Sequence, residues 1–185
     1  IKKMTLKEKL MQLTQLTSNF FIGTDADATG PMSELGLKPD DLVGIGSTLN
    51  FIGIDEKKKI RDKQLAVDPN GIPMMFMVDV VHGCRTIYPI PLAVGASFSP
   101  ELMRECCAMA AREAKAEGID VTFGPMVDLA RDARWGRCME TTGEDPYLNC
   151  LMAAAEVDGF RSEGVVTCVK HFAAYGGAEA GRDYN

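Results

Sequence analysis

Polar and charged side chains follow three apolar stretches of the chain, each at the point where the stretch ends. The first group lies in "MVDVVHGCR" and contains Asp79, His82 and Arg85. The second lies in "MVDLARDARWGR", and the third is the pair Lys170 and His171 in "CVKHF". Together these groups form a directional array of hydrogen-bond donors and acceptors. Such an array suits a neutral, hydroxyl-rich ligand such as a sugar, because an aspartate accepts from two adjacent hydroxyls.

The groups meet in space if the apolar stretches are parallel strands of one sheet. The stretches are apolar almost throughout and alternate with amphipathic segments, which is typical of a parallel sheet covered by helices. The carboxyl ends of such strands open at a common mouth. We predict strands at 42–47, 73–78, 121–126 and 165–170, and helices at 55–66, 99–117 and 148–161.

The ends of two helices carry local signals. Thr5-Leu-Lys-Glu8 is a capping box, which predicts a helix from there to about Thr17. Ser99 is placed as an N-cap, with Pro100 at the first helical position and Gly118 just past the end. Segment 18–40 has no periodicity and is predicted to be a loop. It contains "DADATGPMSELG", which begins like a calcium loop but has Gly36 where the closing glutamate belongs, so we expect no calcium there.

The number of strands limits the fold class. Four strands are too few for a closed barrel, and a (β/α)8 barrel takes about 250 residues. We therefore predict an α/β fold that is roughly the first half of a TIM-type barrel with parallel strands. Residues 1–185 would be one domain, incomplete at its carboxyl end. Unpaired strand edges in a half-barrel favour self-association.

Composition excludes several classes of partner. The net charge of -6 argues against nucleic acid, and apolar stretches such as "IYPIPLAVGA" are shorter than the roughly 20 residues of a membrane span. The first residues lack the pattern of a secretory signal, which favours the cytoplasm. The six cysteines have no metal-ligand spacing and are expected to be free thiols. With His82 and His171 as the two histidines of the chain, we expect no histidine-based metal site. We also expect no cofactor.

Three longer segments resemble a known family. They are "VDVVHGCRTIYPIPLAVGASFSPEL", "FGPMVDLARDARWGRCMETTGEDPYL" and "CVKHFAAYGGAEAGRDYN", and they are similar to the amino-terminal barrel of glycoside hydrolase family 3, the β-glucosidase and β-xylosidase family. The resemblance implies a retaining hydrolase of terminal β-D-glucosyl or xylosyl residues that needs no cofactor. The segment after Lys-His lacks the Pro-Gly-His/Asp-Gly run of related N-acetylglucosaminidases, which favours a glucosidase or xylosidase.

The resemblance also implies roles for single residues. Asp79 would bind hydroxyls of the sugar whose bond is cleaved, and Arg85 would support it. Arg137, Lys170 and His171 would complete the hydroxyl-binding ring. The family's nucleophile and acid/base lie further along the chain than the "KHF" segment, so we expect no catalytic carboxylate among residues 1–185.

Other hypotheses remain open at this point. The chain alone could be an inert or merely sugar-binding half-barrel, or Lys170 could form a Schiff base in an aldolase. His82 suits a core position as well as a pocket. Trp135 is expected to fix the long loop by packing. The other charges of that loop are expected to pair with one another or to cap it: Asp128, Arg131, Asp132 and Arg134.

Overall fold

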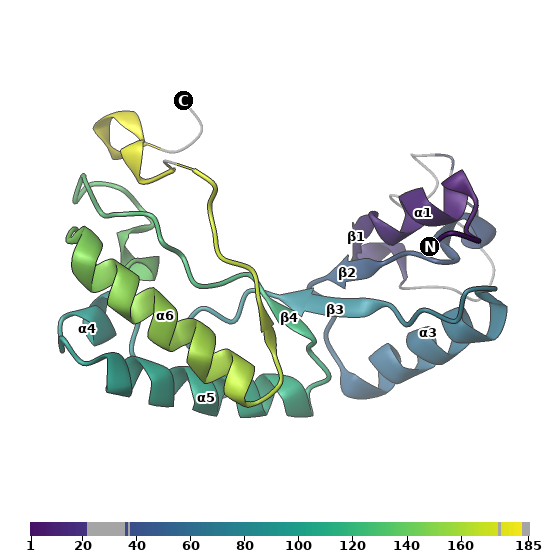
Figure 1. Ribbon diagram of the computed structural model, residues 1–185, viewed down its shortest axis with the longest axis horizontal. Helices are drawn as coiled ribbons and strands as arrows, with labels where there is room; N and C mark the ends of the chain where they lie inside the picture. The colour runs from purple at the N-terminus through teal and green to yellow at the C-terminus, as the bar shows by residue number, and fades with distance from the viewer. Residues whose placement is uncertain (22–35, 37, 174, 183–185) are drawn as a thin grey trace. The chain divides into compact units, whose positions relative to one another are not determined.

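The chain forms two compact units, Ile1–Val78 and Asp79–Asn185, in the computed structural model (Figure 1). The structure describes residues 1–21, 36, 38–173 and 175–182. Each unit is built from parallel strands and helices, as the sequence predicts. In the described part of the chain, no helix is both long and apolar enough to cross a membrane.

The first unit carries three strands around an aromatic core. β1 (Gln15–Thr17) pairs with β2 (Ser47–Leu49), which pairs with β3 (Met75–Val78), all in parallel. The helices are α1 (Leu6–Gln12) and α3 (Ile54–Val67), with 3-10 turns at Ser18–Phe20 and Pro39–Leu42. The buried core consists of Phe21, Ile45, Phe51, Met74 and Phe76.

The amino-terminal helix begins as predicted and ends earlier. Both bonds of the capping box form, with Glu8 N donating to Thr5 Oγ1 at 3.3 Å and Thr5 N to Glu8 Oε2 at 2.5 Å. The prediction that the helix reaches about Thr17 is wrong, because residues 15–17 form β1. The pairing of β1 with β2 overrides the local helical pattern, and Gly46 N donates to Met11 O at 3.0 Å beside the helix end.

The first predicted strand is also misplaced. The strand expected at 42–47 overlaps β2 only at Ser47. Of the apolar residues before β2, Ile45 is fully buried in the core, and Leu42 and Val43 are partly buried. Burial alone does not distinguish a strand from a buried turn. Of the segment 25–36, which begins like a calcium loop, only Gly36 lies within the described residues.

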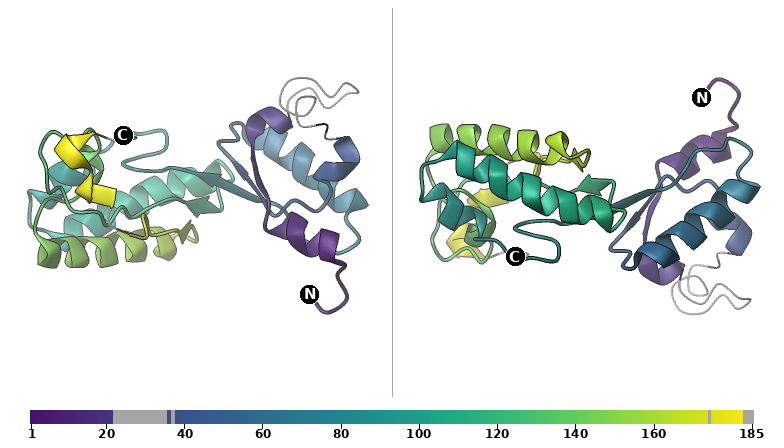
Figure 2. Two further views of the ribbon diagram at one scale, coloured as in Figure 1. Left: turned by 90° about the horizontal axis from the view of Figure 1, so that it is seen from above. Right: turned by 90° about the horizontal axis from the view of Figure 1, so that it is seen from below.

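The second unit follows the predictions more closely. β4 (Val121–Thr122) and β5 (Val166–Thr167) are parallel, and a further bridge joins Met126 to Lys170. α5 (Pro100–Ala116) and α6 (Pro146–Ser162) lie side by side (Figures 1 and 2). Ser99 caps α5 by accepting from Leu102 N at 3.2 Å. The short helix α4 (Pro91–Gly95) and the 3-10 turns Cys138–Glu140, Tyr175–Gly177 and Glu179–Gly181 were not predicted.

Cys107 is buried on α5 and is a free thiol, as predicted, and so are Cys106, Cys138, Cys150 and Cys168. Burial raises the pKa of Cys107, and the nearby Glu156 raises it further. This thiol therefore stays protonated at neutral pH and acts as a small apolar side chain in the helix interface.

α5 and α6 approach each other closely at Gly159. A methyl group added there would lie 2.6 Å from Arg104 O and 2.8 Å from Cys107 Cβ. We expect Gly159→Ala to destabilise the full-length protein by about 1–3 kcal/mol, because overpacking outweighs the better helix propensity of alanine. Thermal unfolding measures the effect, and Ala154→Gly at an exposed α6 position is the control for propensity alone. Stabilisation by Gly159→Ala would show that the helices do not pack this closely.

Candidate functional site

Lys170 lies at the centre of a charged cluster in the second unit. Its Nζ is 2.7 Å from Asp79 Oδ1 and 3.5 Å from Glu140 Oε2. The Lys170 side chain is 14% exposed, whereas that of Asp79 is 46% exposed. A lysine this sheltered needs charged partners, and it has two.

The backbone around the strand ends fixes these side chains. Lys170 N donates to Pro125 O at 2.9 Å, and Val127 N donates to Lys170 O at 2.8 Å. Directly after Asp79, Val80 N donates to the buried Thr122 Oγ1 at 3.0 Å. Residues that are 91 positions apart in the sequence are thus held together by the carboxyl ends of β4 and β5 and the segment that starts at Asp79.

Arg137 joins the cluster through Glu140. The guanidinium donates to both carboxylate oxygens, with Nε 2.6 Å from Oε1 and Nη2 2.7 Å from Oε2. It also lies over the ring of Tyr175, 5.2 Å from the centroid. Burial alone would raise the pKa of Glu140, but the hydrogen bonds from Arg137 and the charges of Arg137 and Lys170 lower it overall. Glu140 therefore stays ionised and holds Arg137 and Lys170 together.

Sequence reasoning missed Glu140. A signal was available, because glutamate three residues after arginine can close an ion pair within one turn. Arg137 is the N-cap of the 3-10 turn and Glu140 is its last residue.

The loop after β4 is fixed by Trp135, as predicted. The indole is 2% exposed and packs edge-on against Tyr175, with ring centroids 5.4 Å apart. The backbone at Gly181 packs tightly against the backbone of this loop. A methyl group added at Gly181 would lie 2.7 Å from Trp135 N. Asp132 and Arg134 pair as expected, 2.6 Å apart, and the bonds from Arg134 lower the pKa of Asp132 to about 2.

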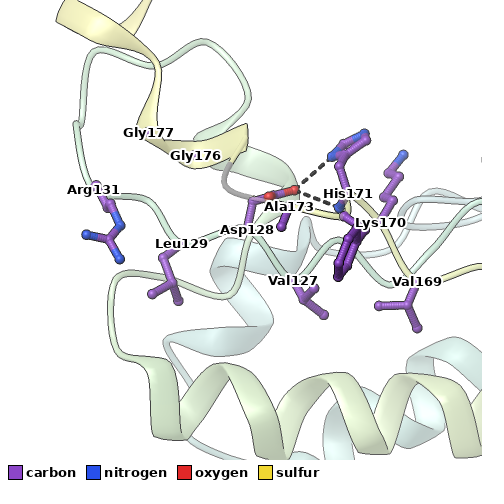
Figure 3. Close-up of a pocket in the computed structure, with 11 residues that line it drawn as sticks. Val127, Asp128, Leu129, Arg131, Val169, Lys170, His171, Ala173, Gly176 and Gly177 are labelled. Carbon is purple, nitrogen blue, oxygen red and sulfur yellow. Dashed lines mark hydrogen bonds and ion pairs between the residues drawn. The ribbon is translucent and has the colours of Figure 1, made fainter.

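His171 and Asp128 form a second pair beside the cluster (Figure 3). His171 Nδ1 is 2.7 Å from Asp128 Oδ2. The prediction that Asp128 pairs with the other charges of its loop or caps that loop is wrong, because its carboxylate contacts His171 and Tyr175, 43 and 47 positions away. The pair lines a cavity together with Val127, Leu129, Arg131, Val169, Lys170, Phe172, Ala173, Gly176 and Gly177.

Arg85 does not join the other predicted residues. Its guanidinium pairs with Glu117 just past the end of α5, its side chain is 74% exposed, and its backbone N–H donates to Glu113 Oε2 at 2.8 Å. His82 Nδ1 lies 3.0 Å from Tyr88 O, which suits a structural role in the turn that it closes. The structure thus brings together four of the five predicted binding residues: Asp79, Arg137, Lys170 and His171.

The arrangement alternates carboxylates and cations in the order Asp79, Lys170, Glu140, Arg137. An ammonium group has three donors, so the two carboxylate contacts of Lys170 leave one for a ligand. The half-exposed Asp79 carboxylate can accept from hydroxyl groups beside it. Such a site is suited to a polar, neutral molecule held by charge-assisted hydrogen bonds.

Parallel strands that carry a polar site at their carboxyl ends are typical of α/β domains, including barrels. Comparison with known proteins identifies the family. The model of the glycosyl hydrolase family 3 N terminal domain matches residues 5–185, and the chain belongs to this family.

Relatives and solved structures agree with this assignment. The chain is 36% identical to a periplasmic beta-glucosidase of Salmonella typhimurium, over 100% of this chain and 24% of that protein. It is 29% identical to a putative beta-xylosidase of Formosa agariphila, over 100% of this chain and 27% of that protein. The beta-glucosidase of Listeria innocua, solved in complex with glucose, matches with a TM-score of 0.93 and 45% identity over 100% of this chain and 27% of that chain.

The matches also set the scope of what this chain represents. It spans about a quarter of the length of these relatives. The predicted fold class, the amino-terminal part of a TIM-type barrel of this family, is confirmed.

Proposed function

We propose that the chain is the sugar-binding part of a retaining β-glycosidase that hydrolyses terminal β-D-glucosyl or xylosyl residues. The observation that carries the proposal is the cluster of Asp79, Lys170, Glu140 and Arg137 in a chain of this family. Support for the substrate comes from relatives named beta-glucosidase and beta-xylosidase. A beta-glucosidase related to this chain has also been solved with laminaribiose.

In this proposal, the residues of the chain bind and orient the sugar. Asp79 accepts hydrogen bonds from two neighbouring hydroxyls, while Lys170, Arg137 and His171 bind others. Hydroxyl contacts strengthen as the sugar distorts towards an oxocarbenium-like transition state, so they contribute to the rate as well as to affinity. The family resemblance implies that the nucleophile and the acid/base are not among residues 1–185, and we assign neither role to a residue of this chain.

An assay of the full-length protein tests the function. We expect hydrolysis of aryl β-glucosides or β-xylosides with retention of the anomeric configuration. NMR of the first product formed measures this configuration. The matched α-glucoside and the β-N-acetylglucosaminide are the control substrates and should react far more slowly. An inverted product, or preference for the N-acetylglucosaminide, would contradict the proposal.

The alternative of an aldolase has less support. A Schiff base needs an amine that is free to attack a carbonyl, whereas Lys170 Nζ is held by Asp79 and Glu140. Borohydride trapping with a carbonyl substrate tests it directly. The other alternative, an inert or merely sugar-binding half-barrel, applies to residues 1–185 alone. For these residues in isolation we expect no turnover.

Several predictions from the sequence stay predictions. The role of Arg85 in substrate binding rests on the family resemblance alone, because its guanidinium pairs with Glu117. Self-association of the isolated chain and the extent of the domain, residues 1–185, are likewise predictions. The cytoplasmic location is also a prediction, since one relative is named periplasmic and another lysosomal.

A further inference from the structure

We propose that Asp128 is a positioning residue for His171. It keeps a proton on Nδ1 of the imidazole and thereby leaves Nε2 as an acceptor for a sugar hydroxyl. The identity of the ligand rests on the proposed function, whereas the form of the imidazole rests on the geometry of the pair alone.

The hydrogen bonds of Asp128 determine which nitrogen carries the proton. Oδ2 accepts from His171 N at 3.1 Å and lies 2.7 Å from His171 Nδ1, and Oδ1 accepts from Tyr175 N at 3.2 Å. A backbone N–H can only donate, so both carboxylate oxygens act as acceptors. Nδ1 must then be the donor to Oδ2, and a neutral imidazole with its proton on Nδ1 has a lone pair on Nε2.

Burial separates the two partners. The side chain of Asp128 is 3% exposed, whereas that of His171 is 34% exposed and lines the cavity in Figure 3. A buried carboxylate must be satisfied by donors from the protein. Asp128 is therefore held by its own contacts, and a ligand would meet the imidazole first.

The ring of His171 is fixed by a second contact. Tyr175 packs against it at a centroid distance of 4.6 Å and an interplanar angle of 81°, and Tyr175 packs in turn against the buried Trp135. The bond to Asp128 fixes the Nδ1 edge of the imidazole. A residue that merely capped the backbone would not need this contact with a ring nitrogen.

Lys170, the residue before His171, supplies the hydrogen-bond donor that complements the Nε2 acceptor. Lys170 is held by Asp79 and Glu140, and His171 is held by Asp128. Lys170 presents a hydrogen-bond donor, and His171 presents an acceptor nitrogen. Two adjacent residues with opposite hydrogen-bonding roles match two hydroxyls of one sugar ring.

A double-mutant cycle in the full-length protein tests the coupling. Asp128→Asn keeps the shape of the side chain but places an amide NH2 at one of the two oxygen positions. In one orientation the NH2 donates to His171 Nδ1, which moves the imidazole proton to Nε2. In the other orientation the NH2 faces Tyr175 N, so two donors oppose each other. We expect this variant to lower kcat/KM for an aryl β-glucoside by roughly tenfold to a hundredfold, as expected for a charge-assisted hydrogen bond. In a His171→Ala background, the same substitution should change kcat/KM by less than about twofold.

The control is Asp132→Asn in the same loop, whose carboxylate pairs with the exposed Arg134. It should leave kcat and KM unchanged, and thermal unfolding should show that all variants fold. Losses from Asp128→Asn that are equal in the presence and absence of His171 would overturn the proposal, because they would mean that Asp128 acts through the backbone alone.

A readout without activity separates this inference from the proposed function. NMR of the full-length protein with 15N-labelled histidine distinguishes the protonated ring nitrogen from the unprotonated one, and the His171→Ala variant identifies the signal. We expect Nδ1 to be protonated and Nε2 unprotonated in the neutral ring. A proton on Nε2 would overturn the inference, whereas the expected form in a protein inactive on β-glycosides would support it and refute the proposed function.

Discussion

Replacing Asp79 with alanine is expected to lower kcat/KM for an aryl β-glucoside by a factor of about 10³ in the full-length protein. The substitution removes an acceptor for two hydroxyls, and each charge-assisted hydrogen bond contributes about 1.5–3 kcal/mol. It also takes away the nearer partner of Lys170, whose side chain is only 14% exposed. Because these bonds strengthen in the transition state, kcat should fall together with kcat/KM.

A comparison of three variants isolates the cause. Asp79→Asn keeps the shape and one acceptor oxygen but loses the charge, and we expect a smaller loss than with alanine. Asp158→Ala removes an exposed carboxylate of α6 that pairs with Arg161 at 2.8 Å, and should leave the rate unchanged. Near-normal turnover of Asp79→Ala, with unfolding unchanged, would remove Asp79 from the sugar site.

Local signals predicted the second unit well because its helices have their own boundaries. Ser99, Pro100 and Gly118 mark the ends of α5, and the observed helix is Pro100–Ala116. The first unit lacks such signals between α1 and β1. Residues 15–17 continue a helical pattern, and only the strand pairing with residues 47–49 makes them extended. A sequence read locally does not contain that partner.

The same limit applies to the site. Parallel strands and the family resemblance were enough to predict that Asp79, Arg137 and Lys170 meet. The resemblance also placed Arg85 there, but in the structure its guanidinium pairs with Glu117. The sequence could not predict this pair, because it does not rank the carboxylates that compete for one arginine. Asp128 was misassigned for the related reason that its partner is distant along the chain.

Glu156 is a buried acid that the sequence did not single out. It lies on α6, is 5% exposed, and its Oε1 would be 3.0 Å from a methyl group added at Gly124. Burial raises the pKa of Glu156 to about 8, although the charge of Lys170 acts in the opposite direction. The carboxyl group is therefore neutral in the folded protein at pH 7.

Glu156→Gln is expected to remove a pH-dependent loss of stability. The pKa of this acid is 4.5 as an ordinary side chain and about 8 when folded, so between these values the folded state holds a proton that the unfolded state has released. The free energy of unfolding of the wild type should then fall as pH rises from 4.5 to about 8 and change no further from this group. Glutamine has no proton to lose, and should match the wild type below pH 4.5 and exceed it above pH 8 by on the order of a few kcal/mol.

Calorimetric unfolding of the full-length protein across this pH range measures the difference. The exposed Glu105 of α5 provides the matched control, because Glu105→Gln changes the same groups without burial and should alter stability little. The difference in the free energy of unfolding between Glu156→Gln and the wild type must grow as pH rises. A difference that is constant across the range, or that closes as pH rises, would mean that Glu156 is ionised in the folded protein, and its carboxylate would then contribute negative charge near Lys170 at the sugar site.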